Sequence, residues 1–296
     1  MSDAPPEAQD ALFALFAVKL DLVSEGSVER ALNNLEDGQS VREALEAAGK
    51  LTAEQAERVQ AALDPEVIPG YRIEGEAGRG GMGVVYRARQ ISMDRLVALK
   101  VLTRRLSRDE AYVAKFLEEA RSAAKLNHEN VVAAIDAGEA EGLYYFVMEF
   151  VAGASLADVI DEEGPLPWEK ALDVTEQVAR ALEHAHQAGL VHRDVKPENI
   201  LYTAEGGRAI KLIDFGYAGM WAADSPLTGL CGTPDYVAPE VLTWYDDDEN
   251  GTPYGKGSDL WSLGVLLYVI LSGCSPFCAE EEEALLKQVA SAKFEF

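Results

Sequence analysis

The chain has 296 residues, and 48% of them are hydrophobic, which is enough for one large or two ordinary domains with packed cores. Its 51 Asp and Glu residues outnumber 26 Lys and Arg residues, so the net charge is −25. That charge argues against nucleic acid or an anionic membrane as the main partner and favours basic peptides.

The first part of the chain predicts helices. Residues 1–10 are small and acidic, so we expect a disordered tail there. Acidic residues also stand where a signal peptide would carry positive charge, which indicates a cytoplasmic protein. From residue 11 to residue 64, apolar spacings of three and four predict a small helical bundle. Ser24 and Thr52 are the expected N-caps of two of its helices, and a third should begin at Val41.

This bundle has two interpretations, a structural appendage or a docking and regulatory module for a protein partner. Residues 65–70 contain two prolines and a glycine, which stop the helical pattern and predict a linker.

A glycine-rich segment follows, Gly78-Arg79-Gly80-Gly81-Met82-Gly83. In a dinucleotide-binding fold a helix would begin after the glycines, but Val84–Ala88 continues as a strand. The pattern favours a flap whose backbone amides close over phosphates. Val97-Ala98-Leu99-Lys100 predicts a further strand, and a helix is predicted over Tyr112–Leu126, which contains Glu118 and Glu119.

The most informative stretch lies between apolar flanks at Val191 and Leu201. It contains His192-Arg193-Asp194, then Lys196 and Asn199, and it follows an amphipathic helix predicted over Trp168–Ala188. The spacing puts a carboxylate, an ammonium group and an amide on one loop. Phosphoryl transfer requires such a set, with a carboxylate for the hydroxyl proton, a cation near the phosphate and an amide oxygen for Mg²⁺.

Beyond this loop, a strand predicted over Ala209–Ile213 leads into Asp214-Phe215-Gly216, and Ala238-Pro239-Glu240 follows. The apolar run Leu260–Leu271 is too short to span a bilayer and is interpreted as a buried helix. The cysteines lack metal-binding spacing and indicate buried or half-buried thiols in a reducing compartment. They are Cys231, Cys274 and Cys278.

In this order the motifs over residues 71–296 resemble those of eukaryotic-type (Hanks-type) protein serine/threonine kinases. The glycine-rich segment resembles the bacterial kinases, whereas Cys231–Pro234 and Trp261–Gly264 resemble the calmodulin-dependent kinase group. The resemblance implies an α+β, two-lobed kinase fold after the small all-α domain. It consists of an antiparallel N-lobe with helix C (71–147), a hinge (148–152) and a mainly helical C-lobe (153–296). The C-lobe stops before the family's last helices, so we expect an incomplete kinase domain.

The resemblance also implies the chemistry, which is transfer of the γ-phosphate of Mg-ATP to Ser or Thr hydroxyls of proteins. Asp194 would deprotonate the acceptor, Lys196 would neutralise the γ-phosphate, and Asn199 and Asp214 would hold Mg²⁺. Lys100 would orient ATP and pair with Glu119, or with Glu118 as the alternative. Glu198 and the acidic surface imply basic substrates. The expected nucleotide-binding residues are Gly78, Gly80, Gly83, Val85, Ala98, Lys100, Met148, Glu149, Val151 and Asp214.

Regulation is implied for the activation segment, residues 214–240. Arg193 would bind a phosphorylated side chain there, and Thr233 marks Ser/Thr specificity. Many relatives carry the phosphorylated Thr four residues before Thr233, where this chain has Gly229. Either Ser225 or Thr228 takes its place, or the segment is ordered without phosphate. Residues 244–257 form an acidic insertion, which predicts a solvated loop.

The alternative function is a catalytically silent nucleotide-binding scaffold, or pseudokinase, that docks partners through its N-terminal helices. Such proteins lose the catalytic Asp, the phosphate-binding Lys or the metal-binding Asp. Asp194, Lys100 and Asp214 are all present, which favours the enzyme.

Overall fold

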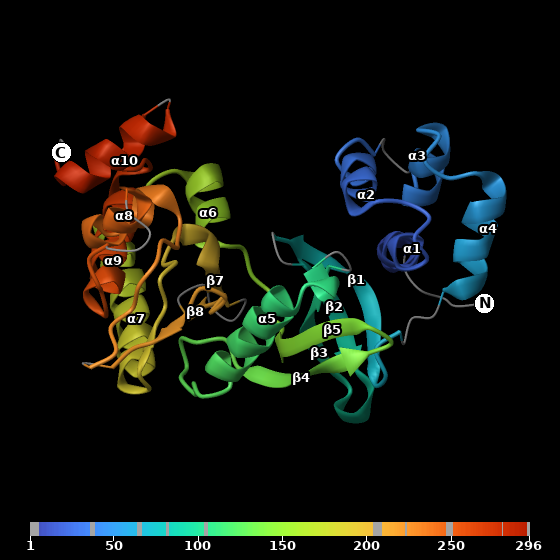
Figure 1. Ribbon diagram of the computed structural model, residues 1–296, viewed down its shortest axis with the longest axis horizontal. Helices are drawn as coiled ribbons and strands as arrows, with labels where there is room; N and C mark the ends of the chain where they lie inside the picture. The colour runs from blue at the N-terminus through green and yellow to red at the C-terminus, as the bar shows by residue number, and fades with distance from the viewer. Residues whose placement is uncertain are drawn as a thin grey trace. The chain divides into compact units, whose positions relative to one another are not determined.

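The computed structural model describes residues 6–35, 39–63, 67–80, 83–103, 106–203, 209–222, 224–246, 251–279 and 281–294. The chain forms two compact units, one of residues 1–117 with 135–150 and one of residues 118–134 with 151–296. The first unit contains helices and an antiparallel sheet, and the second is mainly helical (Figure 1). This confirms the predicted α+β class with an all-α region at the start.

The N-terminal helices are α1 (Pro6–Lys19), α2 (Glu25–Leu32), α3 (Val41–Ala47) and α4 (Ala53–Ala62). Proline fits the first turn of a helix, where its missing N–H needs no partner. The expected disorder of residues 1–10 is therefore wrong from Pro6 onward, and residues 1–5 lie outside the described part of the chain.

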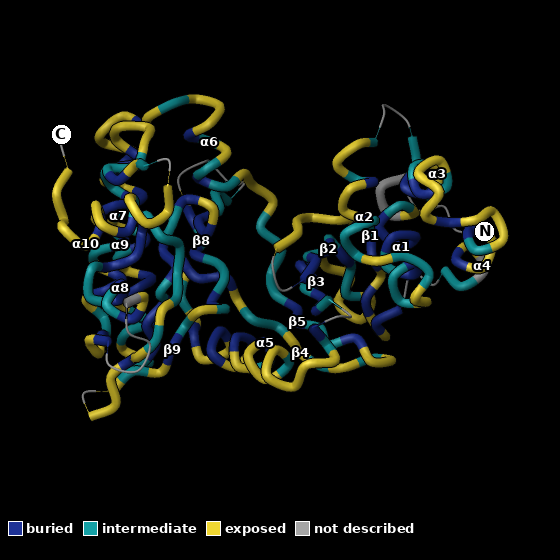
Figure 2. Tube along the Cα trace, turned by 45° about the horizontal axis from the view of Figure 1, so that its top comes forward, coloured by how far each residue is buried: buried dark blue, intermediate teal, exposed yellow. Residues whose placement is uncertain are grey.

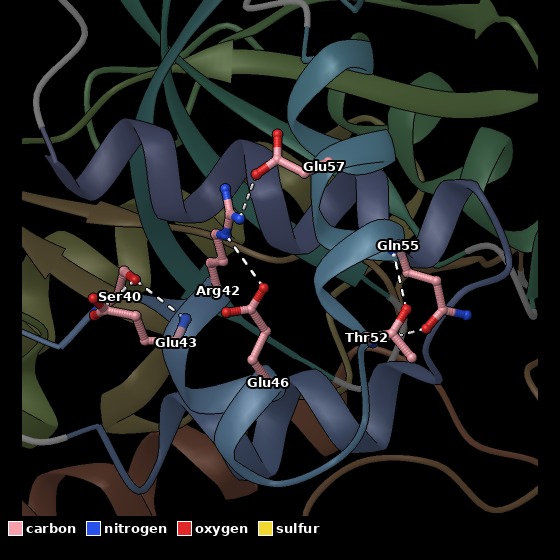
Figure 3. A network of polar contacts seen from close by, with 7 residues as sticks. All are labelled: Ser40, Arg42, Glu43, Glu46, Thr52, Gln55 and Glu57. Carbon is pink, nitrogen blue, oxygen red and sulfur yellow. Dashed lines mark hydrogen bonds and ion pairs between the residues drawn. The ribbon is translucent and has the colours of Figure 1, made fainter.

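The starts of α3 and α4 are fixed by capping boxes (Figure 3). The Thr52 hydroxyl accepts a hydrogen bond from the Gln55 amide at 3.2 Å, and the Gln55 side chain accepts one from the Thr52 amide at 2.9 Å. Ser40 and Glu43 make the same pair of bonds at the start of α3. Thr52 is thus confirmed as an N-cap. Ser24 holds the N-cap position of α2, but its hydroxyl makes no capping bond.

Figure 3 also shows how α3 and α4 are joined at the surface. Arg42 of α3 lies 2.6 Å from a carboxylate oxygen of Glu57 on α4 and 3.5 Å from one of Glu46. These groups are partly exposed, so the ion pairs add little to the free energy of unfolding.

The sheet of the first unit has the strand order β1-β2-β3-β5-β4. Its strands are β1 (Tyr71–Arg79), β2 (Gly83–Gln90), β3 (Arg95–Leu102), β4 (Ala134–Ala140) and β5 (Leu143–Glu149). The β1–β2, β2–β3 and β3–β5 pairs are antiparallel. The strands predicted after the glycines and before Lys100 are confirmed.

Alternation along β2 and β3 gives the sheet two different faces. Tyr86 lies opposite Leu99, and Val84 lies opposite Val101, and these side chains are buried in one core with the apolar residues of α1. Figure 2 shows the buried stretches of α1, β2 and β3 in dark blue. Val67 and Ile68, placed in the predicted linker, are buried in the same core. Helix α1 therefore packs directly on the sheet of this unit, and α3 and α4 pack on α1.

The second unit is built around α7 (Trp168–Gln187) and α9 (Gly257–Ser272), which pack against each other. The boundary between the two units falls within helix α5 (Glu110–Ala123), whose residues from 118 onward belong to the second unit. The remaining helices are α6 (Leu156–Glu163), α8 (Pro239–Asp246) and α10 (Glu282–Ser291). Short strand pairs are formed by β6 (Leu190–Val191) with β9 (Gly219–Met220), and by β7 (Ile200–Tyr202) with β8 (Ile210–Leu212). Single 3₁₀ turns cover Ile91–Met93, Leu106–Arg108, Pro197–Asn199 and Pro234–Tyr236.

Two expectations about burial in this unit need correction. The run Leu260–Leu271 is helical as predicted, but only one face of α9 is buried, and Leu260 is 60% exposed. Cys231 is half buried as expected, whereas Cys274 and Cys278 are exposed. Within the described ranges, no helix combines the length and the hydrophobicity needed to cross a membrane.

Candidate functional site

The loop that carries His192, Arg193 and Asp194 is anchored by one buried carboxylate. Asp259 of α9 is 0% exposed, and its oxygens accept hydrogen bonds from the backbone amides of His192 and Arg193 at 2.9 and 2.8 Å. The ring Nε2 of His186 lies 2.7 Å from the same carboxylate. A buried carboxylate needs such partners in place of water, and in return it fixes the backbone that leads into Asp194.

The backbone of this region is strained at two non-glycine residues. Arg193 has φ of 69° and Asp214 has φ of 60°, both in the left-handed region. Each costs of order 1 kcal/mol and persists only where surrounding contacts hold it. The ring of His192 contributes, because it contacts Phe215 edge-on and its Nε2 lies 3.1 Å from the Ile213 carbonyl oxygen. The two segments are thereby held together.

Asp194 lies at the centre of a compact polar cluster and is 3% exposed. The Asn199 side-chain amide donates to the Asp194 carbonyl oxygen at 2.8 Å and to its Oδ2 at 2.9 Å. The Lys196 ammonium lies 3.0 Å from Oδ2. The Thr233 hydroxyl donates to Oδ1 at 2.7 Å and accepts from Lys196 at 2.7 Å. One hydroxyl therefore sits between a carboxylate and an ammonium group.

Asn199 and Asp214 carry oxygens of the kind that bind Mg²⁺. Both hydrogen bonds of the Asn199 amide nitrogen go to Asp194, so its amide oxygen is the group left to meet a cation. The Ile213 amide donates to the Asn199 carbonyl oxygen at 2.9 Å, which ties the backbone before Asp214 to Asn199. Amide and carboxylate oxygens are the ligands that Mg²⁺ prefers in proteins.

The glycine-rich turn of the first unit depends on one close approach. Gly80 and Gly83 exchange backbone hydrogen bonds of 2.9 and 3.3 Å, while Gly81 and Met82 between them lie outside the described residues. A Cβ at Gly83 would lie 2.2 Å from the Val101 carbonyl oxygen, so no side chain fits there. A Cβ at Gly78 or Gly80 would meet nothing within 4 Å.

The expected nucleotide-binding side chains of β2, β3 and β5 share one sheet face. Val85 lies opposite Lys100, and Ala98 lies opposite Met148. This face is opposite to the one that packs with α1, because neighbouring residues of a strand alternate. Glu149 ends β5 and is half buried.

Glu119 and Val151 are further expected site residues of the second unit. Glu119 is buried on α5, and a Cβ at Gly216 would lie 3.2 Å from its carboxylate oxygen. Glu118 is exposed, so the structure favours Glu119 of the two alternatives. Val151 is half buried.

The contacts of Arg193 and the exposure of Ser225 and Thr228 bear on the expected regulation. The Arg193 guanidinium donates to the Tyr217 carbonyl oxygen and, at 3.4 Å, to the Tyr254 hydroxyl. Ser225 and Thr228 are exposed. Tyr254 was missed from the sequence because it lies in the insertion and 61 residues from Arg193, where no local pattern marks it.

Comparisons with known proteins agree with this geometry. Residues 71–295 match the protein kinase domain family. Serine/threonine-protein kinase pkn3 of Myxococcus xanthus is 42% identical over 216 residues, which cover 70% of this chain and 38% of that protein.

Two further relatives are similar over the same region. Serine/threonine-protein kinase PknB of Mycobacterium leprae is 38% identical over 231 residues, covering 76% of this chain and 36% of that protein. For serine/threonine-protein kinase PrkC of Bacillus subtilis the identity is 39% over 212 residues, covering 71% and 31%. The chain thus spans less than two fifths of the length of each of these relatives.

Proposed function

Because the chain belongs to the protein kinase family, we propose that it transfers the γ-phosphate of Mg-ATP to serine or threonine hydroxyls of proteins. The observation that carries this proposal is the Thr233 hydroxyl, which donates to Asp194 Oδ1 and accepts from the Lys196 ammonium. A hydroxyl can therefore reach the Asp194 carboxylate at hydrogen-bonding distance with a cation beside it. A substrate hydroxyl needs the same pair of neighbours.

In the proposed reaction Asp194 orients the substrate hydroxyl and accepts its proton. The hydroxyl oxygen forms a bond to the γ-phosphorus, the bond from that phosphorus to the β–γ bridging oxygen breaks, and ADP leaves with the electron pair. Lys196 offsets negative charge on the transferred group, and Asn199 keeps the Asp194 carboxylate in place through its amide.

The metal and the nucleotide depend on further residues. Asn199 and Asp214 would hold Mg²⁺, which neutralises charge on the phosphates when bound. Lys100 would contact the phosphates and pair with Glu119, and the turn at Gly80 and Gly83 would cover them. Val85, Ala98 and Met148 would contact the base from one sheet face, with backbone groups of Glu149 and Val151.

The substrate class follows from charge. Glu198 is exposed beside the Asp194 cluster, and the whole chain carries a net charge of −25. We propose a preference for Ser or Thr flanked by Arg or Lys. A peptide with flanking Arg should be phosphorylated faster than the same peptide with Glu, and Glu198→Gln should reduce that ratio.

The test of the activity is transfer of radiolabelled phosphate from Mg-ATP to a basic Ser/Thr peptide. Asp194→Asn and Lys100→Met should each lower the rate by about 10²-fold or more, because each removes a group needed in the transition state. Asp161→Asn, an exposed carboxylate on α6, is the matched control and should keep the wild-type rate. If wild-type protein transfers no phosphate while nucleotide still raises its melting temperature, the silent scaffold replaces this proposal.

A further inference from the structure

The guanidinium of Arg193 has two hydrogen-bond acceptors within the protein. It lies next to Asp194 in the chain, and its backbone amide is anchored to Asp259. Its side chain donates to the carbonyl oxygen of Tyr217 and to the hydroxyl of Tyr254. Both acceptors are neutral, and both come from the protein itself.

Tyr254 bridges Arg193 to the activation segment. The side chain is 5% exposed, its hydroxyl donates to the Gly229 carbonyl oxygen at 2.9 Å, and it lies 3.3 Å from the Cys231 sulfur. Its backbone exchanges hydrogen bonds of 2.9 and 3.0 Å with Leu227. Burial, together with the hydrogen bond to Cys231, raises the pKa of Tyr254 to about 12, so the phenol stays protonated and can donate to Gly229.

Gly255 and Lys256, which follow Tyr254, also contact the activation segment, at Trp221. A Cβ at Gly255 would lie 2.3 Å from the Trp221 ring nitrogen, and the Lys256 ammonium lies 4.9 Å from the Trp221 ring centre. The Lys256–Trp221 distance fits a cation–π contact. The end of the insertion therefore packs against the first part of the activation segment.

The insertion is itself closed at its base. The Trp244 ring nitrogen donates to the Thr252 carbonyl oxygen at 2.8 Å, and the Thr252 amide donates to the Thr243 hydroxyl at 2.6 Å. The solvated-loop expectation is therefore wrong for Trp244, Gly251 and Tyr254, which are buried, whereas Thr252, Pro253 and Gly257 are exposed as expected. Residues 247–250, the acidic run, lie outside the described part of the chain.

We propose that the Tyr254 hydroxyl takes the place of a phosphorylated side chain as the partner of Arg193, so that the activation segment is ordered without phosphorylation. Tyr254 is thus a positioning residue, which acts through Arg193 and Gly229 on the segment that ends in Thr233. A phosphate would offer Arg193 charged oxygens. The phenol offers Arg193 a neutral oxygen instead, on a residue whose backbone pairs with Leu227. The predicted effect on the rate rests on the proposed kinase activity, whereas the predicted ordering of the activation segment does not.

The test compares Tyr254→Phe with Tyr245→Phe, a matched control on α8 whose ring is 52% exposed. Tyr254→Phe keeps the packed ring and removes the hydrogen bonds, so kcat for a basic peptide should fall about 10-fold, while KM for ATP changes less than about twofold. Tyr245→Phe should keep both values. The double variant Arg193→Ala with Tyr254→Phe should lose less than the product of the two single losses, because the two groups share one hydrogen bond.

Phosphorylation is tested on the same protein. After phosphatase treatment, with mass spectrometry showing an unmodified segment, wild-type protein should keep its rate. A Ser225→Ala and Thr228→Ala double variant should keep it as well. Loss of activity in either sample, or additive effects of the Arg193 and Tyr254 changes, would overturn the inference.

A structural readout separates this inference from the proposed activity. Amide hydrogen exchange of residues 225–233 should become faster in Tyr254→Phe than in wild type or Tyr245→Phe, whether or not phosphate is transferred. Unchanged exchange overturns the role of Tyr254. Faster exchange in a protein that transfers no phosphate upholds that role and rejects the kinase activity alone.

Discussion

The sheet of the first unit and the His192–Asn199 loop of the second are stabilised by different interactions. One face of β2 and β3 is held by apolar side chains that are buried together with α1. The loop is held by a few polar atoms, above all the carboxylate of buried Asp259. Apolar burial is shared among many neighbours, so a single change there costs stability and leaves the other face of the sheet in place. A polar anchor has no substitute, so one change should remove both stability and activity.

The largest effect should follow from Asp259→Ala. The change leaves the backbone amides of His192 and Arg193 without their acceptor in a buried place, which should lower the free energy of unfolding by roughly 3–5 kcal/mol. We expect phosphate transfer to fall at least about 100-fold even at temperatures where the variant is folded. Urea unfolding and the peptide assay measure both, with Asp161→Asn as control. An active Asp259→Ala protein would contradict the anchoring role.

A change in the apolar region should separate stability from activity. Phe13 of α1 is 3% exposed, so Phe13→Ala should lower the free energy of unfolding by about 3–5 kcal/mol through lost burial and the cavity it leaves. Leu20→Ala, at a residue 36% exposed, should cost much less. Below its melting temperature the Phe13 variant should keep a wild-type KM for ATP. A wild-type melting temperature would show that the helices do not support the sheet.

A smaller effect should follow from the helix caps. Thr52→Ala removes an N-cap bond to the Gln55 amide and should cost about 1 kcal/mol. Ser24→Ala is the matched case, because the Ser24 hydroxyl caps no amide and should contribute only a few tenths. If chemical denaturation gave the same loss of unfolding free energy for both variants, the N-cap hydrogen bond of Thr52 would not be the stabilising contact.

The smallest effect concerns pH. Burial, with a lesser contribution from the nearby His184, lowers the pKa of His128 from its ordinary value of 6.5, and the His128 Nδ1 accepts a hydrogen bond from the Asn130 amide. The unfolded chain therefore binds this proton more tightly. The associated stability is complete above pH 6.5 and is lost as pH falls through the lower folded value. Melting temperatures from pH 7.5 to 5 should drop less in His128→Gln than in wild type, and parallel curves would contradict this.

Much of the fold could be predicted because its signals are local. Alternation predicted the strands before Lys100, and the Ser and Thr positions predicted helix starts at Val41 and after Thr52. The prediction of a disordered tail, made from composition, was wrong from Pro6 onward. Helix α1 begins there, and the apolar residues that follow are buried in the core with the sheet. Composition cannot report that contact.

In the candidate site, too, the residues marked by local spacing were predictable and those that depend on tertiary contacts were not. The spacing of Asp194, Lys196 and Asn199 was visible in the sequence, and the structure brings these residues into one cluster with Thr233. Tyr254 was not visible, because its role arises from a pairing with Leu227 and a contact with Arg193 that are both distant in the sequence. Residue spacing within a loop is a local property, whereas the partner of Arg193 depends on the tertiary fold.

The two faces of β2 and β3 also bear on how the chain avoids misfolding. Successive residues of one strand serve the core and the proposed nucleotide face in turn, as with Leu99 and Lys100. A slip of one residue in the strand register would turn the lysine into the apolar core and Leu99 toward solvent. Such a misfolded form would lose stability and nucleotide binding together. One strand register therefore determines both the core and the proposed nucleotide face, so a chain that binds nucleotide must also have paired these strands correctly.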